Sequence, residues 1–263
     1  CRGNTCFVFD RAHDALTAGC FNMVFQDDAK ARGEQDKPWL LRHAAIQSVT
    51  LNLPRLGYKS EGDEEKLFAG LGDLMNKAAK THVQKKDFLE KLLSYAERGP
   101  LAVLAMNADG HPFLRMNRSY YIIGLVGLNE LARIVQGSEL HESKEAMDFG
   151  LEVVSFLQKE AGRLSSEFGM KFILEQSPAE TTAYRFARLD LKYHSPAAGR
   201  FVEGDIAEGS IYYTTSTHLN VAADVVPLQR VIEEGKFHPL MAGEVVTHLQ
   251  LAAAHPGPEV LGR

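Results

Sequence analysis

The spacing of apolar residues along the chain predicts its first regular elements. Residues 46–53 (IQSVTLNL) alternate between apolar and polar and are rich in β-branched residues, which predicts a strand that ends before Pro54. Ser60 is expected to cap the next helix, because acidic residues fill the turn that follows it. That helix should stop at Gly99-Pro100. Its apolar face is predicted to contain Leu67, Leu71, Leu74, Ala78, Phe88, Leu92 and Tyr95.

Short apolar strands and longer helices alternate through the rest of the sequence. Strands are predicted at residues 6–9, 101–106, 171–175, 211–215 and 245–251. Helices are predicted at residues 120–135, 147–164, 177–190 and 227–234. This alternation is typical of an α/β fold whose strands run parallel.

Composition narrows the classes of protein to which the chain can belong. Its 263 residues are 45% hydrophobic and 24% charged, which suits a globular protein with a sizeable core. No apolar run approaches the ~18 residues that a membrane span needs. A net charge of −5 argues against nonspecific nucleic-acid binding. Three cysteines are too few for a disulfide framework, so we expect reduced thiols and a cytoplasmic location.

Cys20 is the cysteine best placed for chemistry. It follows Gly19 and precedes an irregular stretch, so a loop tip can present its thiol. The alternative is a small buried apolar residue, which is the usual role of a free cysteine. Cys1 and Cys6 are separated by four residues without a second pair, which argues against a zinc site. The sequence also has no Walker A loop and no Gly-x-Gly-x-x-Gly fingerprint.

The segment Ser177-Pro178-Ala179-Glu180-Thr181-Thr182 joins a predicted strand to a predicted helix. Pro178 suits the first helical position, with Ser177 as the N-cap. The free N–H groups of such a helix start, with hydroxyls nearby, can bind a phosphate. The alternative is a plain helix cap. Glu180 would repel a phosphate, so we expect it to point away from the site.

Two further polar segments lie at predicted strand ends. Residues 212–218 (YYTTSTH) gather hydroxyls and the imidazole of His218 where parallel α/β folds place their ligand crevice. The alternatives are an exposed ladder of hydroxyls and a histidine that only makes structural hydrogen bonds. Asn52 and Arg55 end the first strand, and Arg55 can reach a phosphate or an aspartate, or remain a surface charge.

Four segments together resemble a known family. They are residues 47–58 (QSVTLNLPRLGY), 124–130 (GLVGLNE), 177–190 (SPAETTAYRFARLD) and 212–216 (YYTTS). In this order they strongly resemble the anaerobic (class III) ribonucleoside-triphosphate reductases, a glycyl-radical enzyme family. The resemblance covers nearly the whole chain, and VTLNLPR and SPAET are its most specific parts.

The resemblance implies a ten-stranded α/β barrel, built from two five-stranded halves with a finger loop through the middle. Residues 1–263 would form the C-terminal half-barrel portion of the catalytic domain, beginning near the finger loop. The glycyl-radical loop, the four-cysteine zinc site and the N-terminal half are then expected to be absent. The start at Cys1, with no initiator methionine, fits this expectation of a piece of a longer protein.

The resemblance also implies an activity, which is anaerobic reduction of ribonucleoside triphosphates for deoxyribonucleotide synthesis. A radical held on a glycine passes to a finger-loop cysteine, whose thiyl takes the 3′-hydrogen of the ribose. Cys20 is assigned this role, with Cys1 as the alternative because Cys1-Arg2 imitates a pair found in some members. The residues that the resemblance assigns to substrate binding are Asn52, Ser177, Ala179, Glu180, Thr181, Thr182, Tyr213, Thr214 and Ser216.

Partners are implied in the same way. They are a ribonucleoside triphosphate, a radical-SAM activase that generates the glycyl radical, a second copy of the chain and a reductant, with no nucleic acid or membrane. Thr215 replaces a common asparagine, and Ala45 stands where some members have an asparagine near the ribose. The Ala45 departure leaves formate and a thioredoxin-like protein open as reductants. A phosphate-binding module without catalysis, and a scaffold that docks partners on the 143–168 helix, remain alternative functions.

Overall fold

The computed structural model describes residues 15–18, 22–25, 44–107, 110–176, 179–243 and 245–249. Cys1, Cys20 and Ser177, and the strand predicted at 6–9, lie outside these residues. Strands β1 (Ala15–Ala18) and β2 (Asn22–Phe25) pair antiparallel.

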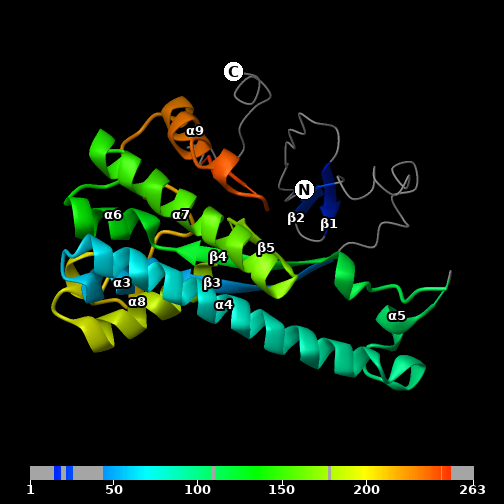
Figure 1. The fold of residues 1–263 in the computed structure, drawn as a ribbon. Helices are drawn as coiled ribbons and strands as arrows, with labels where there is room; N and C mark the ends of the chain where they lie inside the picture. Colours follow the sequence, from blue (N-terminus) through cyan, green and yellow to red (C-terminus); the bar gives the residue numbers. More distant parts are fainter. Residues whose placement is uncertain are drawn as a thin grey trace.

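A parallel sheet of three strands lies at the centre of the described residues (Figure 1). Its strands are β3 (Ala44–Asn52), β4 (Ser119–Val126) and β5 (Lys171–Glu175), in that spatial order. Asn52 is in register with Val126, and Gly124 with Glu175, so the carboxyl ends of all three strands meet at one edge. The predictions of a parallel α/β fold and of strands at 46–53 and 171–175 are confirmed.

Two long helices connect these strands and pack on one face of the sheet (Figure 1). Helix α4 (Glu64–Leu93) precedes β4, and α7 (Lys144–Phe168) precedes β5. The rings of Phe68 and Phe156 meet edge to face, with their centroids 5.2 Å apart, where the two helices touch. Both helices were predicted from their apolar stripes, and the stripe of α7 is largely buried. The stripe predicted for α4 is buried only in its first half, at Leu67, Leu71 and Ala78. Phe88 and Tyr95 are exposed, and α4 ends at Leu93, before the predicted stop at Gly99-Pro100.

The predicted cap of α4 is wrong. Asp63 is the N-cap, and its carboxylate accepts a hydrogen bond from the amide of Lys66. Ser60 instead ends α3 (Leu53–Ser60), where its hydroxyl donates to the carbonyl of Gly57. A second short helix therefore precedes α4, and Gly62, with φ of +83°, turns the chain between them.

The helix predicted at 120–135 is two elements. Residues 119–126 form β4, and α6 (Leu128–Gln136) begins after Gly127. A strand buried on both faces has an unbroken apolar run, which periodicity cannot distinguish from a buried helix. Gly127 makes the break possible, because its φ is +84° and a Cβ there would lie 2.3 Å from the ring of Pro54.

Two predicted strands are also wrong. Residues 101–106 contain the short helix α5 (Ala102–Ala105), which has no buried residue and lies away from the sheet (Figure 1). Residues 245–249, the described part of the strand predicted at 245–251, form no strand. The strand predicted at 211–215 is shorter, since β7 (Ser210–Tyr212) pairs only with β6 (Glu203–Asp205).

The other elements are helices. Helix α8 (Glu180–His194) follows β5, and α9 (Pro227–Gly235) confirms the helix predicted at 227–234. The 3-10 turns are η1 (Ala96–Arg98), η2 (Met116–Arg118), η3 (Ala198–Arg200) and η4 (His238–Leu240). None of the described helices has the length and apolar character that crossing a membrane requires.

Candidate functional site at the carboxyl edge of the sheet

Helices α3, α6 and α8 and residues 213–217 gather at the carboxyl edge of the parallel sheet (Figure 1). Thr215 forms an antiparallel bridge with Val126, the last residue of β4. The amide of Gly127 donates to the carbonyl of Thr214 (2.8 Å), and the amide of Ser216 donates to the carbonyl of Leu125 (3.1 Å). These bonds hold residues 214–216 at the edge where parallel α/β proteins bind ligands.

Asp190 of α8 organises one part of this edge, although its side chain is fully buried. It accepts hydrogen bonds from Asn52 Nδ2 (2.9 Å), Arg55 Nε (2.7 Å) and the Tyr213 hydroxyl (3.2 Å). A second nitrogen of Arg55 lies 2.6 Å from the same carboxylate. Arg55 was expected to contact a phosphate or an aspartate, or to remain a surface charge, and in the structure it contacts an aspartate. A buried carboxylate with this many donors ties α8 to the end of β3, to α3 and to Tyr213, which follows β7.

The same network occupies the polar atoms of two predicted substrate-binding residues. Asn52 Oδ1 accepts from the amide of Arg55 and caps α3, while Nδ2 donates to Asp190. The hydroxyls of Tyr58 and Tyr213 lie 3.0 Å apart. Burial raises the pKa of both phenols far above the usual value, so both stay protonated. Asn52 and Tyr213 therefore shape this edge through contacts within the protein.

A second buried carboxylate, Glu130 of α6, holds Thr214. Its Oε1 accepts from the Thr214 amide (2.9 Å) and from the Thr214 hydroxyl (2.6 Å). Its Oε2 is buried and has no hydrogen-bond partner among the described residues. Burial raises the pKa of Glu130 to about 7, against its usual 4.5, and Glu203 adds to the rise.

Ser216 carries the free hydroxyl of the predicted set. Its side chain is fully buried, its φ is +51°, and Oγ has no partner among the described residues. The next residue, Thr217, accepts a hydrogen bond from Gln176. Gln176 directly follows β5 and begins the connection to α8. Residues 214–217 and the chain leading into α8 are therefore neighbours.

Helix α8 begins at Glu180 without a side-chain cap. Its N-cap is Ala179, so the prediction that Ser177 caps the helix is wrong. Ala179 packs in one buried cluster with Val126 and Tyr213, which brings the helix start to the carboxyl edge. Glu180 and Thr181 are exposed and Thr182 is half-buried. The first amides of α8 lack intrahelical acceptors, which makes this turn suited to an anion.

His218 makes structural contacts. Its Nδ1 lies 3.2 Å from the buried carboxylate of Glu234, which also pairs with Arg230 at 3.2 Å. The ring of His248 lies 5.3 Å from the ring of His218. In the part of the chain that the structure describes, no group of histidine, cysteine and acidic residues has an arrangement suited to a metal ion.

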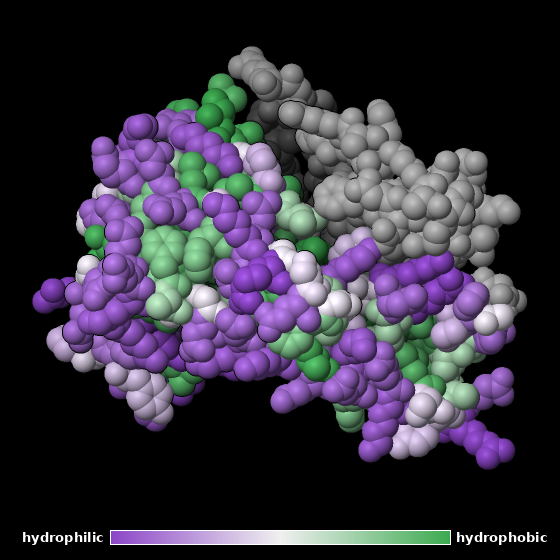
Figure 2. Space-filling model, in the orientation of Figure 1, coloured by the Kyte–Doolittle hydropathy of each residue, from purple (hydrophilic) through white to green (hydrophobic). Residues whose placement is uncertain are grey.

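The alternative function as a docking scaffold can be compared with the surface of α7, whose large apolar residues are buried or half-buried. That alternative requires an exposed apolar stripe on the 143–168 helix. No large apolar residue of α7 is exposed, and Figure 2 shows a mainly hydrophilic surface in its view. Helix α7 therefore lacks the docking face that the scaffold requires.

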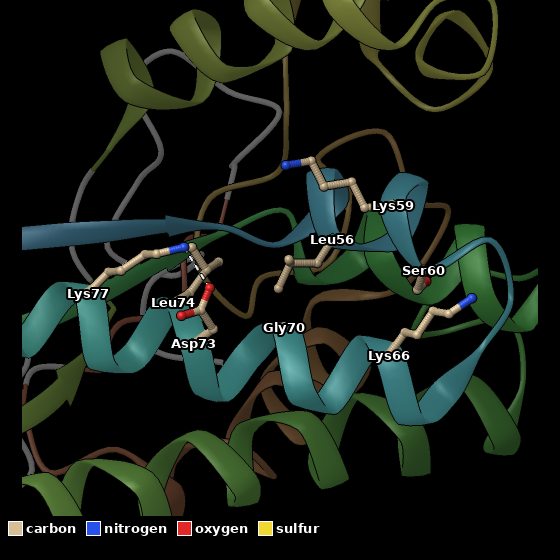
Figure 3. Close-up of a pocket in the computed structure, with 8 residues that line it drawn as sticks. All are labelled: Leu56, Lys59, Ser60, Lys66, Gly70, Asp73, Leu74 and Lys77. Carbon is tan, nitrogen blue, oxygen red and sulfur yellow. Dashed lines mark hydrogen bonds and ion pairs between the residues drawn. The ribbon is translucent and has the colours of Figure 1, made fainter.

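A hollow of about 230 Å³ lies between α3 and α4, away from these networks. Leu56 of α3 points towards Gly70 of α4, and Lys77 pairs with Asp73 at 2.6 Å (Figure 3). The hollow shares no residue with the Asp190 or Glu130 networks. Its lining residues are Leu56, Lys59, Ser60, Lys66, Gly70, Asp73, Leu74 and Lys77.

Reasoning from the sequence missed three residues that organise the edge, namely Asp190, Glu130 and Gln176. Asp190 and Glu130 do lie in the segments that carry the family resemblance, although no role was assigned to them. Their position in those segments was the available signal, because nothing in their local spacing shows that they are buried.

Comparison with known proteins gives the family. A family model described as anaerobic ribonucleoside-triphosphate reductase matches residues 2–263. The Salmonella typhimurium protein of that name is 26% identical over 207 residues, which are 76% of this chain and 28% of the relative. The protein of that name from Enterobacteria phage T4 is 24% identical over 213 residues, which are 77% and 32% of the two chains.

A solved structure agrees with this match. It is the anaerobic ribonucleotide reductase from Thermotoga maritima with dATP bound in the specificity site. It aligns with a TM-score of 0.64 at 25% identity, and the alignment covers 80% of this chain and 33% of that one. The chain thus spans 28% to 33% of the length of these relatives. It belongs to the anaerobic ribonucleoside-triphosphate reductase family.

Proposed function

We propose that this chain supplies the substrate-binding edge of an enzyme that reduces ribonucleoside triphosphates to deoxyribonucleoside triphosphates. The observation that carries the proposal is the uncapped start of α8 beside residues 214–216 at the carboxyl edge of the sheet. Free amides at a helix start bind phosphate oxygens, and the buried Ser216 hydroxyl, which has no partner within the described part of the chain, offers a further donor.

Each predicted substrate-binding residue has a place in this proposal. The α8 amides, with the hydroxyls of Ser177, Thr181 and Thr182, bind the phosphates. Ala179 lets the backbone approach them, while the exposed Glu180 side chain faces solvent. Thr214 and Ser216 line the other side. Tyr213 and Asn52 hold the edge in shape through Asp190.

The reaction itself is assigned to Cys20, with Cys1 as the alternative. The sulfur, as a thiyl, takes the 3′-hydrogen atom, and the S–H bond forms as the C–H bond breaks. The 2′-hydroxyl then takes a proton from the reductant or from water and leaves as water. In the complete enzyme a glycyl radical, generated by a radical-SAM activase, would supply the unpaired electron. Formate or a thioredoxin-like protein supplies two electrons to complete the reduction, after which the hydrogen atom returns from sulfur to C3′.

The domain organisation is part of the same proposal. Residues 1–263 correspond to the C-terminal half-barrel portion of the catalytic domain, working in the cytoplasm as part of a homodimer. The chain by itself is expected to bind a ribonucleoside triphosphate without turning it over.

Calorimetric titration of the 263-residue chain with CTP and with cytidine tests the phosphate site. We expect CTP to bind and cytidine to bind much more weakly, because most of the binding energy comes from phosphate contacts. Ser216→Ala should weaken CTP binding roughly tenfold through loss of a buried hydrogen bond. Ser166→Ala, at an exposed position of α7, is the matched control. Equal affinity for CTP and cytidine would refute the phosphate site.

The phosphate-binding module without catalysis predicts the same calorimetry, so turnover must separate it from the reductase. In the complete enzyme with its activase, Cys20→Ser should abolish deoxyribonucleotide formation while CTP still binds. Unchanged turnover in that variant, followed by loss of turnover in Cys1→Ser, would move the assignment to Cys1. Unchanged turnover in both variants would refute it.

A further inference from the structure

Glu130 contacts the proposed phosphate site without being one of its predicted residues. It lies in the first turn of α6, and its side chain is fully buried. One carboxylate oxygen accepts both the amide N–H of Thr214 (2.9 Å) and its hydroxyl (2.6 Å). Charge-assisted hydrogen bonds of this kind are the stronger ones in proteins.

The start of α6 binds both the carbonyl and the two hydrogen-bond donors of Thr214. The Thr214 carbonyl accepts from the amide of Gly127 at 2.8 Å, while its two donors go to Glu130. Every polar group of Thr214 is therefore bound to residues 127–130. The two residues that follow continue along β4, through the Thr215 bridge to Val126 and the Ser216 bond to Leu125. Glu130 and Gly127 thus fix one end of the segment 214–216, and β4 fixes its other end at Ser216.

We propose that Glu130 is a positioning residue that fixes residues 214–216 for the triphosphate and makes triphosphate affinity depend on its own protonation. The proposal rests on the proposed function of this edge. Because Glu130 is fully buried and accepts both donors of Thr214, it acts through Thr214. Its second oxygen, Oε2, is buried with no partner among the described residues.

An ionised carboxylate beside a phosphate site repels the ligand, whereas the protonated acid does not. Burial raises the pKa of Glu130 to about 7, so both forms are populated near neutral pH. By linkage, a triphosphate that raises this pKa by about one unit binds about tenfold more weakly to the deprotonated form. Triphosphate affinity should therefore fall as the pH rises through about 7.

Other titratable groups face this region and must be separated from Glu130. Glu203 of β6 raises the pKa of Glu130, and Arg133 of α6 pairs with Glu203. Tyr58 and Tyr212, from α3 and β7, have raised pKa values and stay protonated in this range. Glu180, His218 and His248 lie towards the start of α8. Glu130→Gln removes one titration and leaves all of these.

The test measures CTP affinity at about pH 6 and about pH 8, on either side of the pKa of about 7. We expect the wild-type chain to lose roughly tenfold more affinity over this range than Glu130→Gln. Glu152→Gln, an exposed carboxylate on α7, is the matched control and should follow the wild type. Identical pH profiles for the wild type and Glu130→Gln would overturn the protonation effect.

A second measurement distinguishes failure of this inference from failure of the proposed function. The NMR signal of the Thr214 amide should titrate near pH 7 in the free wild-type chain and lose that titration in Glu130→Gln. If this titration is seen but no triphosphate binds, the proposed function fails while the Glu130 contact stands. If the Thr214 signal does not titrate, Glu130 does not control this segment and the inference fails.

Discussion

The face of the sheet that α4 and α7 cover and the carboxyl edge of the same sheet bury different kinds of side chain. Where α4 and α7 cover the sheet, the buried side chains are mostly apolar, such as Leu157 and Leu71, although His82 of α4 is also buried there and lies 2.8 Å from the carbonyl of Ile122. At the carboxyl edge the buried side chains include the carboxylates of Asp190 and Glu130. Burying an apolar side chain stabilises a fold in proportion to area, whereas burying a charge is costly unless it is paired.

The two carboxylates themselves differ. Asp190 meets a guanidinium, an amide and a phenol, and its charge is compensated by Arg55. Glu130 meets only Thr214, and one of its oxygens has no partner among the described residues. Because Arg55 balances its charge, Asp190 holds the edge together. Glu130 has no such cation beside it in the described part of the chain, and burial raises its pKa to about 7, so its charge changes near neutral pH. Stability measurements on variants of these carboxylates and of the apolar core should distinguish the burial of charged groups from the burial of apolar side chains.

The largest loss of stability is expected from Asp190→Ala. This change leaves Arg55 and Asn52 without their buried acceptor, and removing one member of such a pair costs about 4 kcal/mol. Chemical denaturation followed by circular dichroism measures the loss. Asp224→Ala, at an exposed position outside any helix or strand, is the control. A loss below about 1 kcal/mol would mean that Asp190 does not hold the edge together.

A somewhat smaller loss is expected from Leu157→Ala, in the core between α7 and the sheet. The side chain is fully buried, and truncating a buried leucine costs about 3 kcal/mol. The same denaturation experiment applies, with the volume-conserving Leu157→Met expected to cost less than about 1.5 kcal/mol. Equal losses in both variants would contradict the tight packing assigned to this face.

Glu130→Gln should change the pH dependence of stability. The folded-state pKa of about 7 exceeds the usual 4.5, so the protonated acid favours folding. That contribution is fully present below about pH 4.5 and is lost as the pH rises through 7. Relative to wild type, the variant should therefore gain up to roughly 3 kcal/mol between these limits. Unfolding curves at several pH values check this, and parallel curves for both proteins would contradict it.

The smallest effect is expected from Tyr58→Phe. The change removes the hydroxyl that lies 3.0 Å from the Tyr213 hydroxyl, while the Tyr213 bond to Asp190 remains. Loss of one neutral hydrogen bond costs about 1 kcal/mol. Tyr193→Phe, at an exposed position of α8, is the control and should cost nothing measurable. A loss as large as that of Asp190→Ala would mean that Tyr58 carries more of the network than these distances show.

Local pattern was sufficient where one face of an element is polar. The stripes of α4 and α7 and the alternation in β3 have the periods of a helix and a strand, so these elements were predicted. Pattern failed for β4, because a central strand buried on both faces has no polar phase. It failed again at residues 101–106, where four of the six apolar residues form a short helix without a buried residue instead of a buried strand.

Some parts of the candidate site could be predicted from local sequence patterns, and other parts could not. The segments near Asn52, Ser177 and Tyr213 could be singled out because strand ends and helix starts have local signatures. The two carboxylates that organise them could not, since Asp190 and Asn52 are 138 positions apart and Glu130 and Thr214 are 84 apart. Nothing in a local window shows which acidic residue will be buried and which will face solvent.

The sequence by itself determined the parallel α/β class, the long helices and, through four segments, the family. Only the tertiary structure decided that Asp190 is compensated and Glu130 is not, and that the buried Ser216 hydroxyl has no hydrogen-bond partner among the described residues. The physical reason is that burial and pairing depend on which distant segments share a volume. Those quantities set the pKa of a carboxylate and the accessibility of a helix start, and they exist only once the chain is folded.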